Sequence, residues 1–127
     1  MSSLPALLGN LMTILQTHSL CRKVRVVEIK ELSTDQFYFK IRADLPRDNK
    51  FQVRIYYNQG HIDYAYQLFT DVPLLRWDNK EEFHPLPTYP HHYHDEQGNV
   101  KPSLLTGDPS RDLEAVLQEV VSFLARS

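Results

Sequence analysis

Histidines gather in one short stretch of this 127-residue sequence. The segment RWDNKEEFHPLPTYPHHYH, from Arg76 to His94, holds four of the six histidines, the only tryptophan and three of the eight prolines. Imidazoles titrate near pH 6.5, so a pair can act as general base and general acid at about neutral pH. An adjacent arginine can stabilise the charge that develops on a phosphate in the transition state. The segment therefore suggests acid-base chemistry on a phosphodiester.

We select His92 and His94 as the catalytic pair because of their spacing. In an extended HHYH segment side chains alternate, so these two project to one side, and His91 and Tyr93 project to the other. The prolines at positions 85, 87 and 90 are expected to hold HPLPTYPHH extended, which lowers the entropy cost of orienting the imidazoles. His91 is then expected to anchor the segment to the body of the domain. The alternative is that all three histidines only hold the loop.

Metal binding is the competing chemistry for the same histidines. His92 and His94 could chelate an ion from an extended chain, with His84 or Asp95 as the third ligand. None of the standard zinc spacings is present, and the single cysteine, Cys21, can form neither an internal disulfide nor a thiolate zinc cluster. We therefore expect no metal and no other cofactor.

The RWDN motif at positions 76–79 begins the histidine-rich segment. We expect Trp77 to be buried and to orient the segment, because a tryptophan at the end of a short strand packs more often than it recognises a ligand. Asp78 is expected to accept hydrogen bonds from the segment's backbone or from one of its histidines, and Arg76 is expected to point towards the site. The catalytic candidates are therefore His92, His94, Arg76 and Asp78, with Arg54 and Lys40 as further candidate cations.

Strands are the elements that must position these residues. QFYFKIRADL (36–45) and FQVRIYY (51–57) alternate apolar and polar residues, which is typical of strands buried on one face. A β-branched segment from Cys21, HIDYAYQLF (61–69) and LLRW (74–77) add further strands, with turn sequences between them. The pattern predicts an antiparallel meander of four to five strands that leads into the histidine-rich loop.

The polar phase of two adjacent predicted strands collects cations and aromatic rings. Lys40 and Arg42 belong to one strand, and Arg54 and Tyr56 belong to the next. Cations beside rings on a flat face suit a phosphodiester chain whose bases can stack. RNA is therefore the candidate ligand, although a sheet face kept polar only for solubility would show the same pattern.

Helices flank the sheet at both ends of the chain. The segment 3–17 places leucines at helical spacing after Ser3 and Pro5, and a second apolar stripe follows Asp108 and Pro109. The fold class is thus α+β: an N-terminal helix, an antiparallel meander sheet, the histidine- and proline-rich loop, and a C-terminal helix packed on the sheet. With 42% hydrophobic and 24% charged residues, the chain corresponds to one domain, residues 1–127.

Charge is distributed unevenly, although the formal net charge is only −2. Residues 20–58 carry nine Lys and Arg against five Asp and Glu, a net of +4, and residues 59–127 carry five against eleven, a net of −6. The first part could meet a polyanion and the second a basic partner. On charge counts alone, however, the favoured interpretation is that both are solvated faces. No apolar run approaches the roughly 18 residues of a membrane helix, so we expect a cytoplasmic protein without membrane contact. No glycine-rich phosphate loop or paired-carboxylate motif points to another enzyme class.

An ordered set of motifs resembles the TumE family of small prokaryotic toxins. RIYYNQGHIDYAYQ, LLRWDN, HPLPTYPHHYH, GNVKPS and a C-terminal LEAVLQEV helix follow one another over roughly residues 50–124. The resemblance implies a type II toxin encoded beside a helix-turn-helix antitoxin, its expected partner. It also suggests an endoribonuclease akin in shape to barnase and RelE-like toxins, which is an argument from fold analogy. A non-catalytic RNA- or protein-binding module regulated by an antitoxin-like partner is the alternative, and a homodimer is a further option.

Carried over by position, the family pattern adds strand residues to the site. It implies a catalytic role for Tyr66 and substrate binding by Tyr56, Tyr64 and His91, beside the basic residues Lys40 and Arg42. The sequence departs from the pattern at two places. Family members tend to read YSYH where this chain has YAYQ (64–67), and DNAPHH where it has DNKEEFH (78–84). If the strand histidine is catalytic in relatives, this chain is a weakened enzyme or a binding version of the fold.

Overall fold

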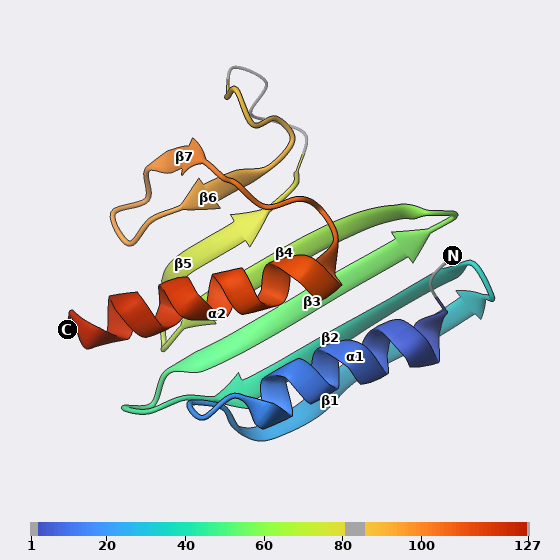
Figure 1. Ribbon diagram of the computed structural model, residues 1–127, viewed down its shortest axis with the longest axis horizontal. Helices are drawn as coiled ribbons and strands as arrows, with labels where there is room; N and C mark the ends of the chain where they lie inside the picture. The colour runs from blue at the N-terminus through green and yellow to red at the C-terminus, as the bar shows by residue number, and fades with distance from the viewer. Residues whose placement is uncertain (1–2, 81–85, 127) are drawn as a thin grey trace.

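A computed structural model describes residues 3–80 and 86–126 of the chain. These ranges form two helices and a single sheet of seven antiparallel strands (Figure 1). Along the chain the elements are α1 (Leu4–Thr17), β1 (Arg22–Ser33), β2 (Gln36–Asp44), β3 (Lys50–Asn58), β4 (His61–Phe69), β5 (Pro73–Asp78), β6 (His92–His94), β7 (Val100–Pro102) and α2 (Pro109–Ala125). Strands adjacent in the sequence are adjacent in the sheet, so the predicted meander is confirmed.

The α+β class is confirmed, whereas the prediction of four to five strands is wrong because the sheet has seven. β6 and β7 have only three residues each, too few for an alternating pattern to be recognised in the sequence. Together they form a hairpin whose turn is closed by the 3.0 Å hydrogen bond from Asp95 N to Asn99 O. His92 and His94 are therefore strand residues of the sheet and do not belong to a loop.

Both helices lie on the same face of the sheet (Figure 1). α1 begins after Ser3, whose Oγ accepts a 3.2 Å hydrogen bond from Ala6 N. α2 begins after Asp108, whose Oδ1 accepts a 3.1 Å hydrogen bond from Ser110 N. Both predicted helix starts are confirmed. In the described part of the chain, neither helix is long and apolar enough to cross a membrane.

The strand register brings the apolar residues together beneath the helices. Phe39 of β2 lies opposite Ile55 of β3, which lies opposite Tyr64 of β4. Two residues further along each strand, Ile41, Val53 and Tyr66 form the next row in the same way. Completely buried members of this core are Leu11, Leu15, Phe37, Phe39, Ile41, Phe51, Val53, Ile55, Tyr66, Leu68, Leu113 and Val120. The two helices and one face of the sheet thus share a single core.

The other face of the sheet has no helix on it in the described part of the chain (Figure 1). Because side chains alternate along a strand, the residues between the core positions point to this side. We call it the open face and define it by Tyr38, Lys40, Arg42, Gln52, Arg54, Tyr56, Asp63, Ala65, Gln67, Arg76, Asp78, His92 and His94. It is the polar face that the sequence predicts.

The segment before β6 turns, so the expected extended conformation is wrong for residues 86–90. Tyr89 N donates a 3.1 Å hydrogen bond to Leu86 O, and His91 N donates a 2.9 Å bond to Thr88 O. Pro87 occupies the second position of the first turn, where its fixed φ favours turning. The Tyr89–Pro90 peptide bond is cis. His84 and the proline at position 85 lie outside the described residues.

Candidate functional site

Two rows of side chains cross the open face from β3 to β6. In the first row, Arg54 lies opposite Ala65, Ala65 opposite Asp78, and Asp78 opposite His92. In the second, Gln52, Gln67, Arg76 and His94 follow one another in the same way. The antiparallel register therefore assembles cations, a carboxylate and two imidazoles that lie as many as 40 positions apart in the sequence, from 54 to 94.

Asp78 is the centre of the polar contacts in these rows. Its Oδ2 lies 2.6 Å from Arg76 Nε and 3.7 Å from His94 Nε2. Its Oδ1 contacts His92 Nε2 and accepts a 3.1 Å hydrogen bond from Lys80 N. The Asp78 side chain is only 5% exposed, so these contacts compensate a nearly buried carboxylate. The expectation that Asp78 receives a backbone hydrogen bond and contacts a histidine is confirmed.

The two histidines of β6 project to the same side as expected but differ in accessibility. His92 is 1% exposed, and its Nδ1 donates a 3.1 Å hydrogen bond to Pro90 O. His94 keeps 28% of its side chain exposed. The expectation that both imidazoles stand at an exposed site is therefore wrong for His92, because the β5–β6 register places that ring against Asp78. His94 is the imidazole of the pair that a ligand on the open face can reach.

The same cluster could hold a metal ion. Asp78, His92 and His94 each offer a ligand atom, and these atoms lie within 4.8 Å of one another. Two imidazoles and a carboxylate suit zinc and other transition metals. Asp95, one of the third ligands considered from the sequence, instead lies 2.8 Å from Lys101 Nζ and accepts hydrogen bonds from the amides of the β6–β7 turn. Asp78 takes the place in the cluster that the sequence spacing suggested for Asp95.

A pocket of about 530 Å³ opens on the open face beside this cluster. In the register, Ala65 stands between Arg54 and Asp78 and has the smallest side chain of its row. The residues that line this pocket, here called the Arg54 pocket, are Tyr38, Arg54, Tyr56, His61, Asp63, Tyr64, Arg76, Asp78, Asn79 and Lys80. His94 and Gln67 line a smaller pocket of about 380 Å³. Arg76 lines both this pocket and the Arg54 pocket.

The three basic residues predicted to share one face do so, but their charges are compensated differently. Lys40 Nζ lies 3.6 Å from Glu28 Oε1. Arg42 donates a 2.7 Å hydrogen bond to Gln52 Oε1. Arg54 is exposed and makes neither an ion pair nor a side-chain hydrogen bond within residues 3–80 and 86–126. Arg54 is therefore the cation of this group that is most available to an anionic ligand.

Two tyrosines assigned to the site from the family pattern lie on the helix side of the sheet. Tyr66 is completely buried, and burial raises its pKa. Its hydroxyl has no hydrogen-bond partner within the described residues. Tyr66 therefore cannot contact a ligand on the open face, and its proposed catalytic role does not fit this geometry.

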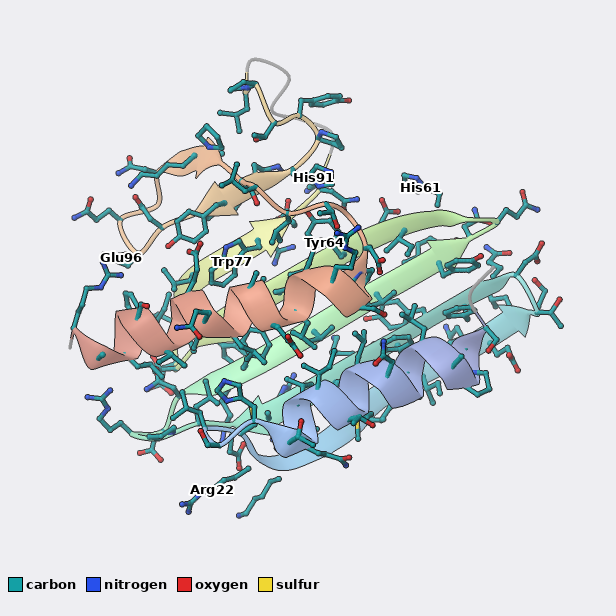
Figure 2. The ribbon with its side chains drawn as sticks, in the orientation of Figure 1. Arg22, His61, Tyr64, Trp77, His91 and Glu96 are labelled. Carbon is teal, nitrogen blue, oxygen red and sulfur yellow. The ribbon has the colours of Figure 1, made fainter. Side chains whose placement is uncertain are left out.

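Tyr64 connects β4 to the segment before β6. Its hydroxyl lies 2.7 Å from His91 Nδ1, and the two rings are stacked with centroids 5.8 Å apart. Figure 2 shows this pair beside the N-terminal end of α2. The expectation that His91 anchors the segment is confirmed. Substrate binding by the Tyr64 hydroxyl or by His91 is not supported, because each is engaged with the other on the side opposite the cluster.

Trp77 is buried as expected, with 3% of its surface exposed. It lies opposite Tyr93 of β6, and the ring centroids are 5.1 Å apart. Figure 2 shows the ring of Trp77 between the sheet and α2. This contact fixes β6 against β5 on the helix side, so it also fixes His92 and His94 on the other side.

Sequence reasoning gave no role in the site to four residues that line the Arg54 pocket, namely His61, Asp63, Lys80 and the Asn79 of the RWDN motif. Asn79 Oδ1 accepts a 3.0 Å hydrogen bond from Tyr64 N, and its Nδ2 donates a 2.8 Å bond to Ile62 O. His61 Nε2 lies 3.0 Å from Asp63 Oδ1. The spacing of His61 and Asp63 by two residues on a strand was the available signal, since it places both on one face.

The site is thus an open polar sheet face that holds an arginine, an aspartate and an accessible histidine. A model of the Toxin TumE family matches residues 11–124. The chain therefore belongs to the TumE toxin family, and the match extends beyond the motifs at positions 50–124 that carry the resemblance. No curated protein and no solved structure gives a significant match.

Proposed function

We propose that this member of the TumE family acts as a toxin by cleaving RNA on the open face without a metal ion. The observation that carries the proposal is the exposed Arg54, which makes no ion pair within the described residues, in a pocket that Arg76 and Asp78 also line. A guanidinium that is not held in an ion pair can bind a phosphate with two parallel hydrogen bonds. Tyr38 and Tyr56 of the pocket supply faces on which bases can stack.

His94 is the acid-base group in this proposal. Its exposed imidazole accepts the proton of a ribose 2′-hydroxyl, and the 2′ oxygen attacks the adjacent phosphorus. The bond to the 5′ oxygen then breaks, and that oxygen takes a proton from water. Arg76 lies between the Arg54 pocket and the pocket of His94, where its charge stabilises the transition state.

Asp78 and His92 are positioning residues in this mechanism. Asp78 holds Arg76 at 2.6 Å through one oxygen and contacts His92 through the other. His92 is buried and fixes the backbone of β6, from which His94 projects. A site held on paired strands keeps its geometry without a ligand, which reduces the cost of reaching the transition state.

The family implies an antitoxin partner. We propose that it is a small helix-turn-helix protein encoded by the neighbouring gene, and that it inhibits the toxin by covering the open face. Purification of the toxin with the product of that gene tests this part. Protection of Arg54 from chemical modification in the complex is the expected result, and unchanged reactivity would contradict it.

Incubation of the purified protein with total RNA, with and without EDTA, tests the activity. Cleavage that persists in EDTA is expected, and Arg54→Ala should reduce it. Arg111→Ala is the matched control, because Arg111 is an exposed arginine on α2, on the covered side of the sheet. Cleavage that EDTA abolishes would instead assign Asp78, His92 and His94 to a metal site.

A non-catalytic RNA-binding module is the second candidate function. The observation that favours it is the burial of His92, which leaves one imidazole of the pair accessible. In that case RNA binds with a dependence on Arg54 but remains intact at every protein concentration. Toxicity in cells would then result from sequestration of RNA.

A further inference from the structure

We infer that the Arg54 pocket binds a guanine base and thereby selects the RNA sequence that the toxin binds. The inference rests on the proposed function, because it assumes that RNA is the ligand. The Arg54 pocket has a volume of about 530 Å³, which lies within the range of pockets that hold one small ligand. The pocket combines aromatic rings, a cation and a carboxylate, which are the groups that a nucleotide requires.

Two tyrosines form a fixed platform for stacking. Tyr38 of β2 lies opposite Tyr56 of β3. The hydroxyl of Tyr56 accepts a 2.8 Å hydrogen bond from Gln36 Nε2, which holds this ring in place without a ligand. The ring of Tyr38 stands beside it on the neighbouring strand. Stacking on such rings is tolerant of sequence, so the platform attracts any base.

Asp63 supplies the group that can discriminate between bases. It lies opposite Tyr56 in the register of β3 and β4, and 54% of its side chain is exposed. His61 Nε2 contacts only Oδ1, at 3.0 Å. A carboxylate has about four acceptor positions, so Asp63 retains the capacity to accept hydrogen bonds from a base on the platform.

Guanine is the base whose Watson–Crick edge matches a carboxylate. Its N1–H and N2 amino group are adjacent donors that can bind both carboxylate oxygens. Adenine and cytosine present one amino donor beside a ring nitrogen acceptor, and uracil presents one donor between two carbonyl acceptors. These acceptors repel the carboxylate of Asp63, so the pocket favours guanine by repulsion of the other bases as well as by attraction.

The phosphate of the same nucleotide has a place beside the base. Arg54 and Tyr56 are two positions apart on β3, so both project from the open face within the pocket. Arg54 then binds the phosphate while Asp63 binds the base. Arg76 borders the pocket on the side of His94, so the RNA chain can continue from the guanosine towards that imidazole.

Titration of the intact wild-type protein with nucleoside 3′-monophosphates tests the inference without any cleavage step. We expect guanosine 3′-monophosphate to bind about tenfold or more tightly than the adenosine, cytidine or uridine compounds. Inosine 3′-monophosphate, which lacks only the N2 amino group, should bind with intermediate affinity. Equal affinities for all five compounds, or no binding of any, would overturn the inference.

Asp63→Asn should remove the preference for guanosine, because the amide offers one acceptor oxygen beside an NH2 donor, and that donor faces one of the two guanine donors. Asp71→Asn is the control, since it makes the same charge change at an exposed position in the β4–β5 turn and should retain the preference. Thermal melting of both variants establishes that they are folded. A guanosine preference that survives in folded Asp63→Asn protein would also overturn the inference.

Failure of the guanine pocket can be distinguished from failure of the proposed ribonuclease function. A guanosine preference in a protein that leaves RNA intact supports the base pocket and contradicts the ribonuclease activity. Cleavage of RNA in EDTA with no preference for guanosine supports the activity and contradicts the base pocket.

Discussion

Arg76 Nε lies 2.6 Å from Asp78 Oδ2, and both side chains project from the same face of β5. The pair leaves the charge of Arg76 largely compensated, whereas Arg54 across the pocket makes no ion pair within the described residues. The two arginines therefore differ in role. In the proposed mechanism Arg54 attracts the phosphate chain, and Arg76 is held in a fixed position between the Arg54 pocket and His94.

Charge reversal at Arg54 should weaken RNA binding more than charge reversal at Lys40. Lys40 is paired with Glu28 at 3.6 Å, so part of its charge is already compensated. Arg54→Glu should also flatten the dependence of affinity on salt concentration, because fewer counterions are released on binding. Titrations of a fluorescent RNA at several salt concentrations measure both effects. An unchanged salt slope in the triple variant Lys40→Glu, Arg42→Glu and Arg54→Glu would contradict the assignment of this face.

Asp78→Ala should destabilise the protein by about 3–5 kcal/mol, because it removes the partner of a buried imidazole. The carboxylate also contacts Arg76 Nε and the Lys80 amide, which lose their partner in the variant. Urea unfolding of the wild type and the variant measures the difference. Asp63→Ala is the control, since Asp63 is an exposed aspartate on the same face. Equal unfolding midpoints for the two variants would show that the Asp78 contacts contribute little.

His94→Ala and His92→Ala should separate activity from stability. His94 is 28% exposed, so its removal should leave the melting temperature near that of the wild type while RNA cleavage and toxicity are lost. His92 is buried between Asp78 and Pro90 O, so its removal should cost about 1–3 kcal/mol or more. Thermal melting and cleavage assays on both variants give the answer. Full activity in folded His94→Ala protein would remove this residue from the mechanism.

Trp77→Ala should cost about 3–5 kcal/mol, since the ring is nearly completely buried. The loss should also loosen β6, because Trp77 contacts Tyr93 across the β5–β6 pair. Hydrogen exchange of the His92 and His94 amides should therefore accelerate more than that of the central strand β3. Wild-type melting of this variant would show that the ring contributes little to stability.

Stability should fall as the pH is lowered through the usual histidine range, and His91 should account for part of the loss. Burial lowers the pKa of His91 below its usual value near 6.5. Below about pH 6.5, His91 binds a proton more readily in the unfolded chain than in the folded protein. Protonation of His91 therefore favours unfolding. The destabilisation caused by His91→Ala should therefore be largest above about pH 7 and should shrink towards about pH 5. Melting curves of both proteins across this range provide the test, and a constant difference would contradict it.

The sequence by itself determined the elements that depend on local patterns. Strict alternation in β2 and β3 predicted their paired faces, because side chains of a strand alternate whatever surrounds it. Ser3 and Asp108 predicted the helix starts, since a cap acts on amides within three positions of itself. The alternation of HHYH likewise predicted that His92 and His94 share one side.

Only the tertiary structure decided how these elements meet. The sequence did not predict β6 as a strand of the sheet, because a segment of three residues forms a strand only when the edge of β5 pairs with it. That pairing buried His92 against Asp78 and left His94 exposed, although the two imidazoles are equivalent in the sequence. The Arg54 pocket likewise depends on the strand register, which sets residues of β2, β3, β4 and β5 side by side although no local pattern connects them.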